Sequence, residues 1–363
     1  MNIAIVTPEM NAYSETFIKM QIEKLPAKIV FHDSYPPKSA GDRCIFKPTF
    51  FQRSVNRLGK LIGQEFYSYD KNISKILLAD KIDAILAQYG PVAVSMVDIC
   101  IKNKIPLFVH FHGYDAYIKE IIKTYNKDYK RLFEYASGVV AVSSDMRKQL
   151  IKLGCPEEKI KTFPCAPNNK FASNIPKYLH NNFLSVGRFV DKKAPYLTIL
   201  AFQKVVAVYP DAILKMVGDG ILLNSSKNIV KALHLEKNIK FLGAIKAEYI
   251  KNEMENALAY IQHSVTADNG DSEGTPVAVL EASLASLPVV ATIHAGIKDV
   301  VIHDKTGLLS EENDIDTMAK NIIFFIEHKN KAKEYGEAGN GYINNNFSEN
   351  IYIEKLKNMM SNF

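Results

Sequence analysis

Two glutamates, Glu273 and Glu281, lie close together in the stretch DSEGTPVAVLEASLASLP. Thr275 is a favourable N-cap residue and Pro276 suits the first turn of a helix, so this pattern predicts a helix over 276–286. Glu273 then lies in the polar loop before the helix, and Glu281 lies inside it. The first amide groups of such a helix can face an anion. The two carboxylates could therefore contact different parts of one extended ligand.

The environment of Glu281 can be predicted from a helical wheel. Glu281 falls on a flank of the predicted helix, beside Val277 and next to the apolar stripe. A solvated carboxylate would instead lie on the opposite side, with Ser283 and Ser286. Burying a carboxylate without partners costs several kcal/mol, so hydrogen-bond donors are expected around it. The donors could be hydroxyl groups of a ligand or the backbone of a neighbouring loop, and the pattern leaves both alternatives open.

A pair of cations follows a predicted strand in the second half of the chain. The residues SVGR end that strand, so that Gly187 precedes Arg188, and Lys193 follows five residues after the arginine. A guanidinium and an ammonium at the mouth of a sheet can neutralise a diphosphate and stabilise it as it leaves. Cations are also common on protein surfaces, so the pair alone is compatible with plain surface residues.

Glycines close two further predicted strands. The residues VGDG, with Gly218 and Gly220, form a turn that lets the backbone approach a ligand. This turn is not the dinucleotide-binding fingerprint, because Leu223 stands where the third glycine of that motif belongs. A dehydrogenase is therefore the least favoured class. The residues FLGA, with Gly243, repeat the arrangement of a strand followed by glycine.

Two histidines run off the end of a predicted strand in the first half, in the sequence VHFHGYD. Strand alternation places His110 and His112 on one face, so a metal site must be considered. No cysteine or third ligand is patterned near them, and we predict no metal. Asp115 follows in the same turn, and His110 is expected to be packed and hydrogen-bonded.

The elements that position these residues follow from the alternation of short β-branched runs with segments of helical period. This alternation is typical of parallel sheets with helical crossovers and predicts an α/β fold. The residues 162–176, rich in Pro and Asn, suggest a linker between two Rossmann-like domains that face a central cleft. The predicted units are 1–168, 177–345 and a C-terminal helix over 346–363 that packs back toward the first domain. The predicted strands cover 2–6, 28–32, 84–88, 107–111, 138–142, 183–186, 213–217, 239–242, 258–262, 289–292 and 307–309, and the predicted helices cover 14–25, 91–103, 124–136, 145–154, 195–208, 221–234, 248–256, 276–286 and 313–328.

Composition limits the class of protein further. With 363 residues, of which 47% are hydrophobic and 23% charged, the chain is typical of a globular protein of two domains. Positive charge is concentrated in residues 1–170, which hold 25 Lys and Arg against 17 Asp and Glu. Four scattered cysteines are expected to be reduced and buried, and no run is apolar enough to span a bilayer, so we expect a cytoplasmic location.

The residues 43–60 carry basic residues beside three phenylalanines and no acidic residue. This combination suits an anionic membrane surface or a nucleic acid, or else a solvated loop. Nothing else in the chain resembles a nucleic-acid-binding module, so we predict no nucleic-acid partner. A peripheral position on the inner face of the plasma membrane is the alternative that we retain.

The glutamate segment, with the Arg and Lys pair and the His-Gly-x-Asp turn, resembles the signature of family 4 glycosyltransferases, which are retaining enzymes of the GT-B fold. The resemblance covers nearly the full length and implies that no metal or cofactor is required. It further implies donor-sugar contacts for His112 and Glu273, diphosphate contacts for Arg188 and Lys193, sugar and phosphate contacts for Gly274, Thr275 and Pro276, ribose contacts for Glu281, and nucleobase contacts near Ile245.

The amino terminus departs from the family pattern of paired glycines. It carries a Ser-Glu-Thr-Phe turn at 14–17, which resembles the branch that builds bacterial exopolysaccharide and lipopolysaccharide, including colanic-acid-type transferases. Ser14 and Thr16, with Asp115, are weaker candidates for contacts with a phosphate or an acceptor. Capping a helix is the alternative role of Ser14 and Thr16.

With this resemblance we expect a retaining transferase that moves a hexose, or a hexose derivative, from a UDP- or GDP-sugar to a glycan acceptor. A lipid-linked acceptor in surface polysaccharide synthesis fits the membrane hypothesis. Two other functions remain open, namely a sugar-nucleotide epimerase on the same fold and a non-catalytic subunit that binds donor or glycan.

Overall fold

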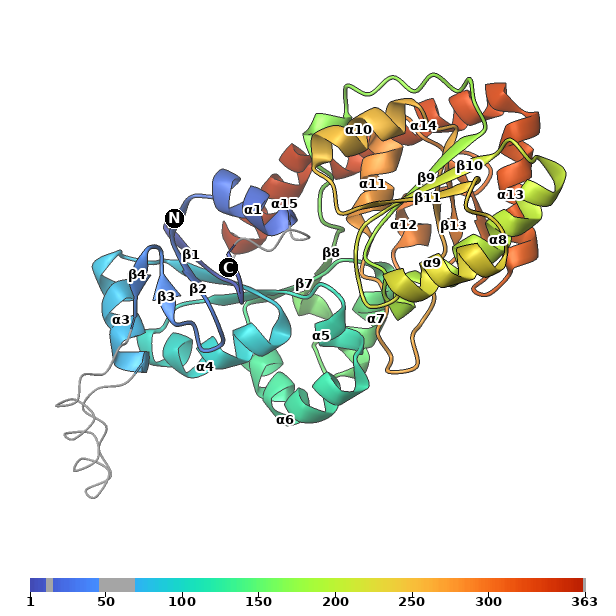
Figure 1. The fold of residues 1–363 in the computed structure, drawn as a ribbon. Coiled ribbons are helices and arrows are strands. Elements are labelled where there is room, and N and C mark those ends of the chain that lie inside the picture. Colours follow the sequence, from blue (N-terminus) through green and yellow to red (C-terminus); the bar gives the residue numbers. More distant parts are fainter. Residues whose placement is uncertain (11–15, 46–68, 362–363) are drawn as a thin grey trace.

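A computed structural model describes residues 1–10, 16–45 and 69–361 of the chain. Within these residues the strands form two sheets, one in each of two lobes (Figure 1). The first sheet has the order β4-β3-β2-β1-β5-β6-β7-β8 and the second the order β11-β10-β9-β12-β13-β14. The pairings in the second sheet are parallel, whereas β3 and β4 make antiparallel pairs at the edge of the first.

The first lobe contains the strands β1 (Ile3–Val6), β2 (Ala27–His32), β3 (Ser39–Ala40), β4 (Arg43–Cys44), β5 (Ala84–Gln88), β6 (Leu107–His110), β7 (Gly138–Ala141) and β8 (Ile160–Thr162). Its helices are α1 (Thr16–Lys24), α3 (Tyr69–Ala79), α4 (Gly90–Asn103), α5 (Tyr114–Tyr117), α6 (Lys119–Tyr135) and α7 (Ser144–Lys152). Alternate residues of β1 enter two separate apolar clusters, because successive side chains of a strand point to opposite faces.

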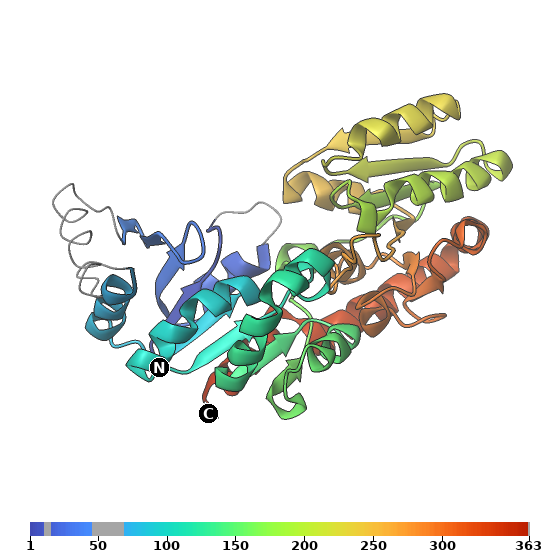
Figure 2. The same ribbon diagram turned by 90° about the horizontal axis from the view of Figure 1, so that it is seen from below.

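The second lobe contains the strands β9 (Asn182–Val186), β10 (Ile213–Val217), β11 (Ile239–Gly243), β12 (Ala259–Gln262), β13 (Val289–Thr292) and β14 (Gly307–Ser310). Its helices are α8 (Pro195–Val208), α9 (Leu223–Ala232), α10 (Ala247–Glu255), α11 (Val277–Leu284), α12 (Ile297–Val300), α13 (Ile315–Glu327) and α14 (Lys329–Phe347). The two lobes are seen from below in Figure 2.

The last helix, α15 (Glu349–Ser361), lies beside α1 in the first lobe (Figure 1). Its residues Tyr352, Ile353 and Leu356 are buried in the apolar cluster that covers one face of the first sheet. The chain thus leaves the first lobe after β8, builds the second lobe, and returns. Lys24 of α1 forms an ion pair with Glu349 at the start of the returning helix.

Each predicted strand is present, with bounds within one residue of those predicted. The short strands β3, β4 and β8, the short helices α5 and α12, and the helices α3 and α14 were not predicted, and α6 begins earlier than predicted. The sequence of α14 contains three glycines, which weaken the helical pattern. One of them, Gly336, is required by packing, because a Cβ there would lie 2.0 Å from the carbonyl oxygen of Ser286.

Candidate active site

His112 lies just beyond the carboxyl end of β6 and is surrounded by aromatic rings. Its imidazole stacks on that of His110, with ring centroids 4.1 Å apart, and its centroid lies 4.7 Å from those of Phe17 and Tyr89. His110 itself is fully buried, and its Nε2 lies 3.0 Å from the hydroxyl of Tyr352. The prediction that His110 is a packed, hydrogen-bonded residue is therefore confirmed.

A chain of hydrogen bonds determines the protonation of His112. Its Nε2 lies 2.8 Å from Oε1 of Gln88, while the amide of Gln88 donates to Gln21 and that of Gln21 donates to Tyr352. Because the Gln88 carbonyl oxygen can only accept, Nε2 of His112 carries the proton. Burial, and then the nearby His110, hold the pKa of His112 well below its usual value. His112 is therefore a neutral imidazole with its Nδ1 lone pair free of a proton.

Asp115 binds backbone amides in the turn that follows His112. One oxygen accepts from the amides of His112 (3.1 Å) and Gly113 (2.9 Å), and the other accepts from Gly90 (3.0 Å) at the start of α4. The carboxyl group is fully buried. This geometry makes Asp115 a support for the His112 turn.

A third potential metal ligand, Cys165, lies beside the two histidines, although it is far from them in the sequence. Ligand atoms of His110, His112 and Cys165 lie within 4.8 Å of one another. The two imidazole planes are only 21° apart. Since imidazole lone pairs lie in the ring plane, nearly parallel rings do not converge on one ion as a tetrahedral site requires. We assign no metal to this cluster, and the metal-free reaction stays a prediction.

Glu273 comes from the loop before α11, and this loop contacts the first lobe. The carboxylate of Glu273 is buried and forms an ion pair with Lys193, with Oε1 and Nζ 3.0 Å apart. The next residue, Gly274, touches the first lobe: a Cβ there would lie 2.5 Å from the His112 carbonyl oxygen and 2.4 Å from Cγ2 of Val142. A glycine is therefore needed where the two lobes meet, and this contact places the loop that carries Glu273 against the His112 backbone.

Thr275 also contacts the first lobe, and this contact corrects the predicted capping role. Its hydroxyl donates to the carbonyl oxygen of Val142 (2.5 Å), while Pro276 is the residue that immediately precedes α11. Thr275 therefore joins the lobes, because its hydroxyl binds the residue just after β7 rather than the helix amides. The backbone amide and hydroxyl of Ser144 donate to Asp299, each at 2.7 Å, and strengthen the same junction.

The two predicted diphosphate ligands lie close enough to influence each other. Arg188 is exposed, and Lys193 is largely buried beside the backbone of Gly187. Burial lowers the pKa of the Lys193 ammonium, the Glu273 carboxylate opposes this, and the charge of Arg188 adds to the lowering. Burial alone would raise the pKa of Glu273, but the nearby lysines outweigh it and lower that pKa. The site therefore holds positive charge next to a carboxylate.

Only glycine fits at position 218, because the neighbouring backbone leaves no room for a side chain. Its φ is +136°, and a Cβ would lie 1.9 Å from the carbonyl oxygen of Gly187. Its amide donates to the carbonyl oxygen of Gly243, so the turns that end β9, β10 and β11 lie side by side. The close approach that requires glycine is thus to the neighbouring backbone. Ile245, just after β11, is half-buried against the apolar cluster below.

Glu281 is half-buried on α11 and accepts a hydrogen bond from the backbone amide of Asn168, in the segment that joins the lobes. This is one of the two alternatives left open by the sequence, a carboxylate bound to a neighbouring loop. The prediction that Ser283 faces solvent is wrong, because Ser283 is fully buried where α11 packs on α14. Because α14 was not predicted from the sequence, the helical wheel of α11 could not show that the Ser283 side of the helix is also buried.

Two family models match this chain. The model described as Glycosyltransferase Family 4 matches residues 24–168, and the model described as Glycosyl transferases group 1 matches residues 168–341. The two matches meet in the segment that joins the lobes and cover most of the chain between them.

The chain belongs to the family 4 glycosyltransferases.

Two curated relatives of this family 4 glycosyltransferase have names that refer to exopolysaccharides. The amylovoran biosynthesis glycosyltransferase AmsK of Erwinia amylovora is 29% identical over 69% of this chain. The Escherichia coli glycosyltransferase WcaL, whose name provisionally assigns it to colanic acid biosynthesis, is 28% identical over 68% of this chain. The matched region spans 62% of the length of each relative.

Solved structures show that the fold of this glycosyltransferase is GT-B. The Anabaena protein Alr3699/HepE, in complex with UDP and glucose, superposes with a TM-score of 0.78 at 18% identity, and all of both chains is covered. The apo form of the lipopolysaccharide outer core galactosyltransferase WaaB superposes with a TM-score of 0.71 at 16% identity, over 100% of this chain and 99% of that one. The predicted pair of Rossmann-like domains facing a central cleft is confirmed.

The remaining predicted contacts of the glycosyltransferase lie at its amino-terminal side. Thr16 is exposed and is the first residue of α1. Ser14 and most of the basic segment 43–60 lie outside the described residues, although Arg43 and Cys44 form β4. None of the four cysteines forms a disulfide bond, as expected for reduced thiols, but Cys44 is exposed rather than buried.

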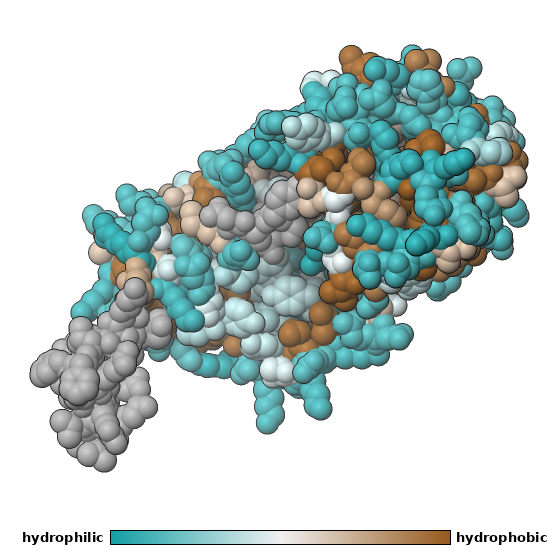
Figure 3. Space-filling model, viewed as in Figure 1, coloured by the Kyte–Doolittle hydropathy of each residue, from teal (hydrophilic) through white to brown (hydrophobic). Residues whose placement is uncertain are grey.

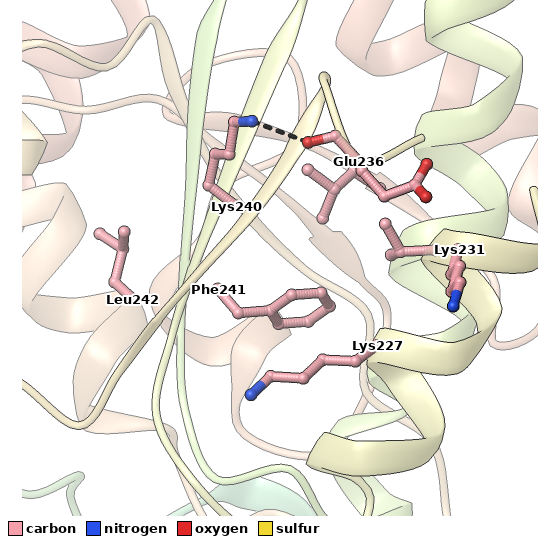
Figure 4. A pocket seen from close by; sticks show the side chains of 8 residues that line it. Lys227, Lys231, Glu236, Lys240, Phe241 and Leu242 are labelled. Carbon is pink, nitrogen blue, oxygen red and sulfur yellow. Dashed lines mark hydrogen bonds between the residues drawn. The ribbon is translucent and has the colours of Figure 1, made fainter. Parts of the chain in front are cut away.

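A groove of about 580 Å³ opens on the glycosyltransferase between α9 and the edge strand β11 (Figure 4). The ammonium of Lys240 donates to the backbone oxygen of Glu236 across it (2.7 Å). None of its lining residues is a predicted site residue, so we do not place the donor there. The lining consists of Lys227, Val230, Lys231, Glu236, Ile239, Lys240, Phe241 and Leu242.

Hydrophilic side chains cover most of the face of the glycosyltransferase shown in Figure 3. Throughout residues 1–10, 16–45 and 69–361, none of the helices combines the length and the apolar character needed to cross a membrane.

Burial of two carboxyl groups predicts how the stability of this glycosyltransferase depends on pH. Burial raises the pKa of Glu281 to about 7 and that of Asp115 to about 6. Between these pKa values and the ordinary ones, the folded chain holds protons that the unfolded chain has lost. The contribution of Glu281 to the free energy of unfolding therefore decreases as pH rises from about 4.5 to 7. We expect the Glu281→Gln variant to remove about 1 to 2 kcal/mol of this decrease. Urea unfolding at pH 5 and pH 7.5 measures it, and identical pH profiles for the variant and the wild type would contradict the prediction.

Proposed function

We propose that this protein is a retaining glycosyltransferase that moves a hexose, or a hexose derivative, from a UDP- or GDP-sugar to a hydroxyl group of a glycan acceptor. The observation that carries the proposal is the close contact of Gly274 with His112 and Val142. Through this contact the loop that carries Glu273, itself paired with Lys193, lies against the backbone of His112 in the first lobe. A donor held by the second lobe would then present its sugar to both lobes.

Each predicted residue has a role in this proposal that its surroundings support. Arg188 and Lys193 neutralise the donor diphosphate and stabilise the negative charge that develops on it as the glycosidic bond breaks. Glu273, held beside Lys193 at 3.0 Å, accepts hydrogen bonds from the sugar hydroxyls. His112, neutral and bonded to Gln88, contacts the sugar from the opposite lobe. The leaving diphosphate assists removal of the acceptor proton on the same face, which retains the anomeric configuration.

Gly187, Gly218, Ile245, Gly274, Thr275, Pro276 and Glu281 complete the proposed donor site. Glu281 binds the ribose hydroxyls, which supply donors for a carboxylate that now has one backbone partner. No metal enters the proposal, since Arg188 and Lys193 provide the positive charge. The names of AmsK and WcaL support an acceptor in exopolysaccharide synthesis, and we extend this to a lipid-linked acceptor.

A panel of nucleotide sugars tests the proposal directly. A ligand that binds only the folded state at 100 times its Kd stabilises it by about 2.7 kcal/mol, so the true donor should raise the Tm clearly. The UDP- and GDP-sugars should stabilise the wild type, and the Arg188→Ala variant should respond much less. Product analysis with an acceptor then separates transfer from epimerisation, since an epimerase converts the donor without any acceptor. A panel in which no nucleotide sugar changes the Tm would overturn the proposal.

We further propose that the protein works at the cytoplasmic face of the membrane, where a lipid-linked acceptor is found. The basic and aromatic composition of residues 43–60 supports this location. In vesicle sedimentation we expect binding to increase with the fraction of anionic lipid and to decrease with salt. Exchange of the basic residues in this segment for glutamine should abolish the dependence on anionic lipid. Equal sedimentation with neutral and anionic vesicles would exclude this location.

A further inference from the structure

We propose that Lys192 and His294 are positioning residues that hold Glu273 in place by binding both polar groups of the Ser272–Glu273 peptide. The inference rests on the proposed role of Glu273 and adds two residues to it. Neither residue was identified from the sequence, which pointed to the adjacent Lys193 and gave Lys192 no role.

Lys192 binds the carbonyl side of this peptide. Its buried ammonium lies 3.2 Å from the carbonyl oxygen of Ser272 and 2.9 Å from Oδ1 of Asp271. The backbone oxygen of Lys192 accepts from the amide of Val265, so the lysine is itself tied to the start of the same loop. A buried ammonium requires such partners, and here they belong to the two residues just before Glu273.

His294 binds the amide side of the same peptide. Its buried imidazole lies in the loop after β13, and Nε2 is 3.1 Å from the backbone nitrogen of Glu273 and 3.1 Å from Oγ of Ser272. A backbone amide can only donate, so Nε2 is unprotonated and accepts. The proton is therefore on Nδ1, which lies 2.5 Å from Oε1 of Glu312 and donates to it. Glu312 in turn accepts from the amide of Thr266 at its other oxygen (3.0 Å).

These contacts matter because Glu273 lies in an irregular loop, where no helix or strand determines the direction of its side chain. With the carbonyl oxygen held from one side and the amide from the other, the peptide plane cannot rotate without breaking a buried hydrogen bond. The carboxylate is thereby directed at Lys193 and at the sugar position. In other enzymes and metal sites, partners of this indirect kind change activity or affinity by about 10- to 100-fold.

Two amide substitutions separate the bonds of His294. In His294→Gln the side-chain oxygen can take the place of Nε2 and accept from the Glu273 amide, but the bond to Glu312 is lost. In His294→Asn the side chain can still donate to Glu312, but the acceptor for Glu273 is lost. We expect His294→Asn to lower kcat by about 10- to 100-fold with little change in donor KM, and His294→Gln to keep kcat within about threefold of the wild type. Equal kcat values for the two variants would overturn the proposal.

A double-mutant cycle tests whether His294 acts through Glu273. In the Glu273→Gln background, His294→Asn should lower kcat by less than about threefold, because residues that act through one another are not additive. A full additional loss in that background would show that His294 acts by another route. Lys192→Met should likewise lower kcat at least tenfold in the wild type and add little to Glu273→Gln.

Hydrogen exchange distinguishes failure of this proposal from failure of the proposed function, because it requires no activity. Exchange measured by mass spectrometry over the peptide 266–275 should be slow in the wild type and in His294→Gln, and faster in His294→Asn. If the wild type transfers no sugar, this pattern still supports the positioning role. Equal exchange in the three proteins would refute it, whatever the enzyme catalyses.

Discussion

Replacing Arg188 by alanine is expected to lower kcat by about 10²- to 10³-fold, the range typical for loss of one group that stabilises charge in a transition state. Arg188 is exposed and close enough to Lys193 to influence its pKa, so its loss should not disturb the core. The guanidinium would stabilise the diphosphate as it leaves, when its charge is greatest, so the effect should fall mainly on kcat. Steady-state kinetics with the donor found in the nucleotide-sugar panel measures it.

The control for this experiment is Arg131→Ala. Arg131 is an exposed arginine of α6 that is ion-paired with Asp98. Its replacement by alanine should leave both kcat and the donor KM unchanged. Arg188→Lys keeps the charge but loses the planar fork and should recover only part of the rate. A near-normal kcat for Arg188→Ala would refute the assignment of the diphosphate site.

Replacing Gly274 by alanine is expected to lower kcat by about 10- to 100-fold, because a small misplacement of catalytic groups has effects of this size. The new methyl group would lie 2.5 Å from the His112 carbonyl oxygen and 2.4 Å from Cγ2 of Val142. A backbone carbonyl cannot move aside as a flexible side chain can, so the Glu273 loop must shift away from His112. We also expect a lower Tm, which thermal unfolding followed by circular dichroism would show.

Gly341 offers a matched control, because a Cβ at this position of α14 meets no atom within 4 Å. Gly341→Ala should keep full activity and gain about 0.5 to 1 kcal/mol in stability, since alanine favours a helix more than glycine does. The double variant with Gly274→Ala and Val142→Ala should recover part of the activity, as one of the two clashes is removed. Full activity of the single Gly274→Ala variant would show that the contact between the lobes is not needed.

Local pattern explains why the sequence predicted so much of the fold. Each predicted strand lies within one residue of its position, because its apolar character is visible within a few neighbouring residues. The same holds for the residues of the proposed donor site, which follow strands and start a helix within short motifs. Glu273 and Lys193 follow two strands of one parallel sheet, whose carboxyl ends lie at the same edge. Their ion pair, with Oε1 and Nζ 3.0 Å apart, agrees with this arrangement.

Tertiary structure alone decided which residues support that site. The hydrogen bonds between His110 and Tyr352 of the last helix, and between His294 and Glu312, join residues with no recognisable spacing. Thr275 suits a helix cap by sequence, yet its hydroxyl binds Val142 across the lobes.

The difference between what was and was not predictable has a physical reason. Periodicity records which side of its own element a residue occupies, so the sequence by itself determined the two α/β domains and the candidate donor residues. The partner of a buried polar group depends on which elements pack together after folding, often more than a hundred residues apart in the chain. Only the packing of the two lobes decided that Gly274 meets His112, and only the surroundings of the Ser272–Glu273 peptide revealed Lys192 and His294.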